Sequence, residues 1–83
     1  MTALYQENSV RNDEWRKKIV CDQAIHHGEP CIRGTRIAVA VVVSSLADVS
    51  MDQLLLEYPQ ISREDVQAAL FYAAEAAHST LVA

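Results

Sequence analysis

The sequence predicts a reversal of chain direction within the stretch Pro30-Cys31-Ile32-Arg33-Gly34-Thr35-Arg36-Ile37. Gly34-Thr35 separates two short runs of strand-forming residues. Glycine supplies the positive φ that the first position of a type II′ turn requires. The stretch therefore predicts a hairpin whose two-residue turn is Gly34-Thr35. In that register Ile32 faces Ile37 on one side of the ribbon.

The same register places Arg33 opposite Arg36 on the other side of the ribbon. Like charges directly opposite each other are unfavourable in a sheet. The pair becomes favourable when a carboxylate, a phosphate or a partner surface lies between the two guanidinium groups. Alternatively, both side chains extend into water, which costs little. The hairpin is therefore either a cationic binding element or a solvated turn.

A short strand is expected before this stretch, and the segment after it has features of both a strand and a helix. Ile19-Val20-Cys21 has the composition of a short strand that can pair with the hairpin. The valines between Val39 and Val49 favour a strand, whereas four apolar positions repeat with helical spacing. These positions are Val39, Val42, Val43 and Leu46. Because the segment has no turn signal and is long for a strand, we expect a helix.

A second helix is predicted from the residues that begin and end it. Ser50 followed by Gln53 has the pattern of a capping box at a helix start. Pro59 disfavours helical geometry in the residue before it, so the helix ends near Tyr58.

The third helix extends from about Arg63 to Ala77, with Ser62 as its N-cap. Glu64 and Asp65 fall in its first turn, where the helix dipole favours acids. Its apolar stripe, which we expect to point inward, consists of Val66, Ala69, Leu70, Ala73 and Ala77. The link from the second helix, residues 58–61, is short enough for a helix-turn-helix and equally suits a small helical bundle.

Three runs in this order resemble a known family. They are Gly28-Glu29-Pro30-Cys31-Ile32-Arg33-Gly34-Thr35-Arg36-Ile37 with Val39, then Ser50-Met51-Asp52-Gln53-Leu54-Leu55-Leu56-Glu57-Tyr58-Pro59, then Ile61-Ser62-Arg63-Glu64-Asp65-Val66-Gln67-Ala68-Ala69-Leu70. Over roughly residues 17–77 the chain resembles small bacterial and archaeal proteins filed as a domain of unknown function (number four hundred and thirty-three). The usual pattern has proline after Arg-Ile, where this chain has Ala38.

The resemblance implies a fold and a biological setting. The family is described as antitoxin-like, with a helix-turn-helix of homeodomain type. The expected fold is therefore mostly α, a three-helix bundle with a helix-turn-helix after a short N-terminal β-hairpin element. We expect residues 1–14 to be a frayed segment and residues 15–83 to form a single domain. A chain this small exposes much apolar surface, which favours a homodimer.

In that setting the expected partner is a PIN-like ribonuclease toxin, whose active site is acidic and binds metal. The chain would act as an antitoxin-like protein that neutralises the toxin and regulates its own operon. An antitoxin can silence such a site by placing a cation among the carboxylates. The candidate partner-binding residues are Arg33, Arg36, Arg16, Lys17 and Lys18.

A stand-alone DNA-binding regulator is the alternative function. A helix-turn-helix reads the major groove with the first residues of its second helix. Here Arg63 suits a contact with guanine and Gln67 one with adenine. The charge of the predicted helical half is unfavourable for DNA binding, because one basic and six acidic residues follow Ile37. The part of the chain up to Ile37 contains six basic and five acidic residues. We therefore expect DNA binding to be secondary and to depend on dimerisation or on the toxin.

The remaining polar residues predict neither a metal site nor catalysis. Cys21, His26, His27 and Cys31 lack the paired spacing of zinc ligands, so we expect no metal. No paired base is recognisable beside Ser44 and no glycine-rich phosphate loop is present, so we expect no enzyme activity, catalytic residue or cofactor. Without a signal segment or a membrane-length apolar run, the two cysteines indicate reduced thiols in the cytoplasm.

Overall fold

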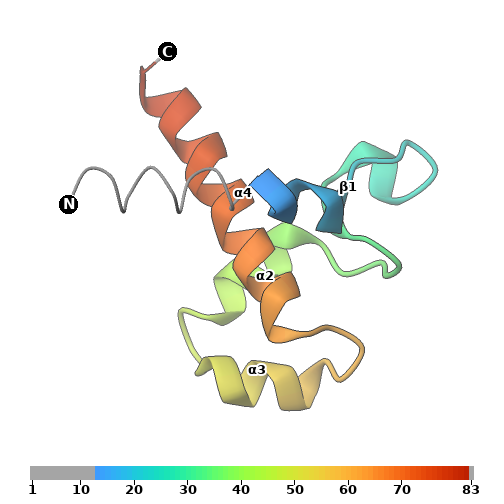
Figure 1. Cartoon of the computed structure of the whole chain (residues 1–83), viewed down its shortest axis with the longest axis vertical. Helices are drawn as coiled ribbons and strands as arrows, with labels where there is room; N and C mark the ends of the chain where they lie inside the picture. The colour runs from blue at the N-terminus through green and yellow to red at the C-terminus, as the bar shows by residue number, and fades with distance from the viewer. Residues whose placement is uncertain (1–12, 83) are drawn as a thin grey trace.

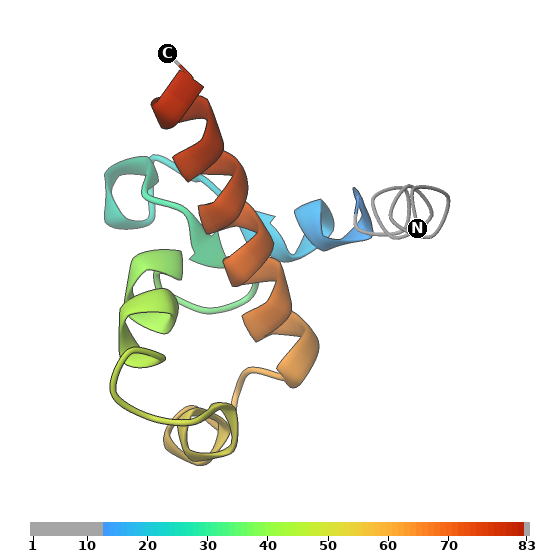
Figure 2. The ribbon, with the colours of Figure 1, turned by 90° about the vertical axis from the view of Figure 1, so that its left-hand side faces the viewer.

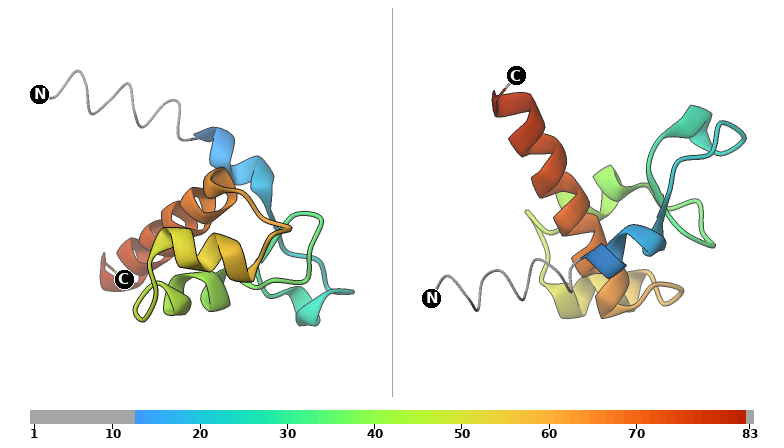
Figure 3. Two further views of the ribbon diagram at one scale, coloured as in Figure 1. Left: turned by 90° about the horizontal axis from the view of Figure 1, so that it is seen from below. Right: turned by 45° about the horizontal axis from the view of Figure 1, so that its top comes forward.

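The computed structural model describes residues 13–82, which are mostly helical with a small β-element near their start (Figure 1). In chain order the elements are η1 (Asp13–Lys18), β1 (Ile19–Val20), η2 (His26–Gly28), β2 (Cys31–Ile32), α2 (Val39–Ser45), α3 (Met51–Glu57) and α4 (Arg63–Val82). Figure 3 shows η1 on one side of α4, with α3 crossing near the start of α4. No helix in residues 13–82 combines the length and the apolar character that crossing a membrane requires.

The β-element confirms the expected strand at Ile19. β1 and β2 pair antiparallel, with Ile19 opposite Ile32 and Val20 opposite Cys31. Ile19, Ile32 and Cys31 are buried, so this short ribbon contributes to the core. The pairing also brings the turn after β2 close to the end of η1.

The turn after β2 has the predicted register but a different geometry. A single antiparallel bridge joins Cys31 to Ala38, and the Ile32 amide donates to the Ile37 carbonyl at 2.9 Å. The Thr35 amide donates to the Ile32 carbonyl at 3.0 Å, so the central turn residues are Arg33 and Gly34. The predicted type II′ turn at Gly34-Thr35 is therefore wrong.

The Thr35 side chain explains this shift of the turn by one position. Its hydroxyl donates to the Ile32 carbonyl at 2.8 Å and accepts from the Ile37 amide at 3.0 Å. These bonds stabilise a wider loop, which a two-residue turn would not contain. Gly34 has a φ of 83° at the third position of the turn, as in a type II turn.

Gly34→Ala should lower the free energy of unfolding by about 1–2 kcal/mol, because the left-handed backbone is costly for a residue with a Cβ. An added Cβ would meet no atom within 4 Å, so the cost is one of backbone conformation alone. Gly34→Asn should cost less, since asparagine tolerates this region. Urea denaturation of both variants tests the ranking, and equal losses would contradict it.

The structure confirms the three helices predicted between Val39 and Ala77. The ambiguous valine segment is helical as α2, although it ends at Ser45. The α3 helix ends at Glu57, next to Tyr58 as predicted, and α4 continues to Val82, beyond the expected Ala77.

The start of each of the last two helices is capped by a serine. The Ser50 hydroxyl accepts a hydrogen bond from the Gln53 backbone amide at 3.1 Å. The Gln53 side-chain amide does not return to Ser50 but donates to the Glu57 carboxylate at 3.3 Å. A reciprocal box forms instead at α4. There the Asp65 amide donates to the Ser62 hydroxyl at 3.2 Å, and the Ser62 amide donates to the Asp65 carboxylate at 2.9 Å.

The core lies where α2, α3, η1 and the β-ribbon meet the first half of α4. Its buried members are Trp15, Ile19, Ile32, Val39, Val42, Leu54, Ile61, Val66, Ala68 and Ala69. Within the predicted stripe of α4, Val66 and Ala69 are buried, but Leu70 is 39% exposed and Ala77 is exposed. The stripe was partly wrong because η1 also covers α4, which rotates its buried face toward Ala68.

Candidate partner-binding surface

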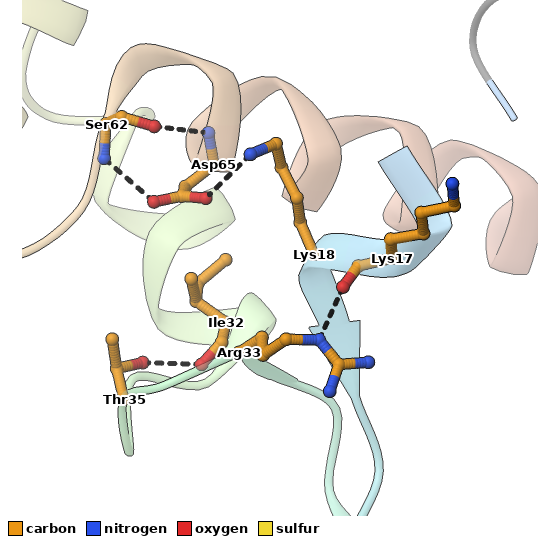
Figure 4. A network of polar contacts seen from close by, with 7 residues as sticks. All are labelled: Lys17, Lys18, Ile32, Arg33, Thr35, Ser62 and Asp65. Atoms are coloured by element: carbon orange, nitrogen blue, oxygen red, sulfur yellow. Dashed lines mark hydrogen bonds and ion pairs between the residues drawn. The ribbon is translucent and has the colours of Figure 1, made fainter. Parts of the chain in front are cut away.

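The β-ribbon brings Arg33 next to the basic end of η1. The Arg33 amide donates to the Lys18 carbonyl at 2.8 Å. The Arg33 side chain turns toward η1, where its Nε donates to the Lys17 carbonyl at 2.5 Å (Figure 4). Two bonds thus fix both the backbone and the guanidinium of a residue in a turn. The structure places Arg33 against the backbone of Lys17 and Lys18, whose ammonium groups point away from the guanidinium (Figure 4), and we call these three residues the basic patch.

The two lysines of the basic patch differ in their surroundings. The Lys17 side chain is 78% exposed and lies 3.2 Å from the Glu14 carboxylate, one turn earlier. The Lys18 ammonium lies 3.7 Å from Asp65, whose carboxylate also caps α4 (Figure 4). Lys18 therefore links η1 to the start of α4. The Lys17–Glu14 pair is exposed on both sides, and pairs of this kind contribute little stability, whereas the Asp65 side chain beside Lys18 is 19% exposed.

Arg16 belongs to a structural contact with α4. Its guanidinium donates to both carboxylate oxygens of Glu75, at 2.8 and 2.5 Å, and lies 4.6 Å from the centre of the Trp15 ring. The hydrogen bond from Arg16 lowers the pKa of the Glu75 carboxyl below its usual value. Of the five candidate partner-binding residues, Arg16 is therefore committed to holding η1 on α4.

Arg36 lies on the far arm of the turn and is exposed. The Arg33 guanidinium, in contrast, is held against η1 by its bond to the Lys17 carbonyl. Within residues 13–82, the bond to Lys17 is the one hydrogen bond found for the Arg33 side chain, and it uses Nε. The two terminal nitrogens, which carry most of the N–H donors of a guanidinium, are those suited to a carboxylate.

The candidate DNA-binding residues lie at the start of α4. The Arg63 guanidinium donates to the Asp52 carboxylate at 2.9 Å, which ties α4 to α3. Gln67 is exposed one turn later and lines a hollow of about 230 Å³ together with Glu14, Glu64 and Phe71. Glu64 and Asp65 occupy the first turn between these two residues.

The two thiols lie in different environments. Cys21 is exposed, whereas Cys31 is buried and its thiol donates to the Glu29 carbonyl at 3.4 Å. Burial is the main cause that raises the pKa of the Cys31 thiol, with the nearby Glu29 carboxylate second. No group of three histidine, cysteine or acidic side chains in the described part of the chain could hold a metal ion.

A thiol-reactive probe at neutral pH should modify Cys21 in the folded protein and reach Cys31 only after unfolding, since the thiolate is the reactive species and Cys31 is inaccessible. The measurement is the time course of reaction with an aromatic disulfide, with and without urea. A Cys21→Ser variant should lose the fast phase. A fast phase that survives this substitution would show that Cys31 is accessible.

Sequence reasoning left Trp15 and Glu75 without a role. Both act in the contact between η1 and α4, where the Trp15 ring packs against Phe71 and Tyr72 at centroid distances of 6.2 Å. The aromatic side chain before a basic run was the available signal, but its partners on α4 lie far away in the sequence.

Comparisons with known proteins bear on the same region of the chain. No curated protein and no solved structure matched it. One family model, described as "Protein of unknown function (DUF433)", matches residues 19–73, from β1 to the middle of α4. The match includes the turn with Arg33 and the start of α4 and lies outside η1. Since it covers more than half of the chain, the protein belongs to the family described as Protein of unknown function (DUF433).

Proposed function

We propose that this protein is an antitoxin-like protein that binds and neutralises a small ribonuclease toxin and regulates its own operon. The supporting observation is Arg33, held by two hydrogen bonds on a turn, beside Lys17 and Lys18. A preorganised guanidinium loses little conformational freedom on binding a carboxylate. Ribonucleases that cleave with metal ions carry carboxylates at the active site, which the basic patch complements.

The charge distribution of the chain bears on this proposal. The protein as a whole carries a net charge of −4. Within the basic patch, Lys17 and Lys18 lie beside Glu14 and Asp65, so the carboxylates of a partner would compete with these two residues for the ammonium groups. Basic side chains at an interface steer association with an acidic partner and discriminate against basic ones. Arg36 completes the cationic character of the turn from its other arm.

The stand-alone DNA-binding alternative has less support. Arg63 is engaged by Asp52, and the first turn of α4 presents Glu64 and Asp65. Acidic residues at that position repel DNA phosphates, whose neutralisation supplies most of the affinity for DNA. We propose that Arg63 and Gln67 contact an operator only when a homodimer or the bound toxin adds basic surface.

Combining Arg33→Ala with Arg36→Ala should weaken binding of the toxin by about 2–5 kcal/mol, because a charged carboxylate would lose its desolvated partner. The measurement is calorimetric titration of the purified protein encoded by the adjacent gene. Arg63→Ala is the matched control, since it removes one arginine from a different surface. Circular dichroism should show that both variants remain folded.

Two outcomes would contradict this proposal. Unchanged affinity of the double variant would remove the turn from the interface. Tight, salt-sensitive and sequence-selective binding of the isolated protein to its own promoter would instead favour the DNA-binding regulator. An Arg33→Lys variant refines the first result, because lysine keeps the positive charge but lacks the planar guanidinium that can donate two hydrogen bonds to one carboxylate. Its affinity for the toxin is expected to lie between those of the unchanged chain and the double variant.

A further inference from the structure

An apolar groove of about 400 Å³ lies between α2 and α4. This volume falls in the range of ligand sites, about 300–1,000 Å³. Its apolar lining consists of Pro30, Val39, Ala40, Val43, Ala73 and Ala76. Tyr72, Ser44 and Glu29 complete the lining. The basic patch is formed by η1 and the turn after β2, so the groove is a separate surface.

The groove lies between a short helix and a long one. The α2 helix has 7 residues and α4 has 20, so α4 continues well past the segment that α2 covers. Figure 2 shows α2 beside α4 and the last turns of α4 projecting beyond it. The walls carry small side chains, chiefly Ala40, Ala73 and Ala76, which allow the backbone of another chain to approach closely.

The lining of the groove carries one charged side chain, that of Glu29. Glu29 lies at its rim, is exposed, and takes part in none of the ion pairs between described residues. The α2 helix contains no lysine or arginine, and the sole lysine or arginine of α4 is Arg63 in its first turn, bonded to Asp52. A chain that enters the groove therefore meets an apolar floor with a negative edge.

We propose that this groove binds an amphipathic helix of a protein partner, with apolar side chains in the groove and arginine or lysine beside Glu29. Helices are recognised in this way, through apolar anchors at i, i+3, i+4 and i+7 in a hydrophobic groove. The inference deepens the proposed function and rests on it for the partner's identity. The groove would supply the apolar anchor that tight interfaces need and that the basic patch lacks.

The test uses a synthetic peptide, so it does not depend on whether the partner is a toxin. The probe is a fluorescein-labelled helical peptide with leucines at i, i+4, i+7 and i+11 and arginines flanking them. Fluorescence anisotropy measures its binding to the full chain. We expect saturable binding, and binding at least about tenfold weaker when the arginines are replaced by glutamates, because like charges would then meet at the rim.

Two substitutions at one exposed position test the groove itself. Ala40→Phe fills it from the α2 side and should weaken binding of the arginine peptide by at least about tenfold. Ala40→Ser keeps the space and should bind as the unchanged chain does. Glu29→Gln should reduce the preference for the arginine peptide over one with glutamines at the flanking positions. Circular dichroism verifies that all three variants fold.

Three results would overturn the inference. Unchanged binding of the arginine peptide to Ala40→Phe would place the peptide elsewhere, and equal binding of the glutamate peptide would remove the charge argument. A third result would show that a second copy of the chain occupies the groove. In that case the unchanged chain sediments as a dimer and does not bind the peptide, and the Ala40→Phe variant sediments as a monomer. If the peptide binds as expected but the adjacent gene product does not bind, the proposed toxin partner is wrong and the groove stands.

Discussion

Leu54→Ala should lower the free energy of unfolding by about 2–5 kcal/mol, the usual cost of truncating a buried leucine. Leu54 is fully buried, with 0% of its surface exposed, and it is the one fully buried residue of α3. The α3 helix has 7 residues, too few to be stable in isolation. Packing of Leu54 on the core therefore holds α3 in place, and with it the connection to α4.

The size of this effect is large for such a small domain, whose total stability is of order 5–15 kcal/mol. Leu56 provides a matched control on the same helix, because the same substitution there removes a side chain that is 76% exposed. Leu56→Ala should change the stability by less than about 0.5 kcal/mol. Urea denaturation followed by Trp15 fluorescence measures both variants. Similar losses for the two would show that α3 is not anchored by Leu54.

The helical part of the fold was predictable because its signals are local. Pro59 ends α3 through its effect on the preceding residue, and the hydroxyls of Ser50 and Ser62 accept from amides three residues later. Interactions within a single turn depend on neighbouring residues, so the sequence contains them completely. The same reasoning explains why the β-branched valines of α2 did not mislead the prediction, since their spacing was helical.

The turn after β2 shows where local reasoning failed. Glycine occupied a left-handed position as expected, but it is the second central residue of the turn and not the first. The Thr35 hydroxyl decides between the two turns by bonding to both arms of the loop. Backbone propensity alone does not include this side-chain competition, so the register was confirmed while the turn type was wrong.

The candidate site was predictable in composition but not in geometry. The basic residues were recognised, yet the bond between Arg33 and the Lys17 carbonyl depends on the pairing of β1 with β2. Arg16 was grouped with the binding residues because its partner, Glu75, lies at the other end of the sequence. Long-range pairs of this kind require the fold to be known, and no periodic pattern reveals them.

Trp15→Ala should have an effect as large as that of Leu54→Ala, about 3–5 kcal/mol, because truncating a buried tryptophan removes a large apolar area and leaves a cavity. Trp15 is 9% exposed and stacks on Phe71 with an interplanar angle of 28°. Tyr72 approaches the same ring edge-on, at an interplanar angle of 90°. Arg16 covers the ring in turn and bonds to Glu75.

Loss of this ring should therefore loosen η1 as a unit, and with it the Lys17 carbonyl that fixes Arg33. Trp15→Phe is the matched control, since a smaller ring keeps the aromatic contact with α4 and should cost clearly less. Because Trp15 is the single tryptophan of the chain, unfolding must be followed by circular dichroism. If alanine and phenylalanine lower the stability equally, the aromatic contact does not anchor η1. If Trp15→Ala destabilises the fold as expected, binding at the basic patch should weaken in a variant whose Arg33 is unchanged, because a mobile guanidinium loses more freedom on binding.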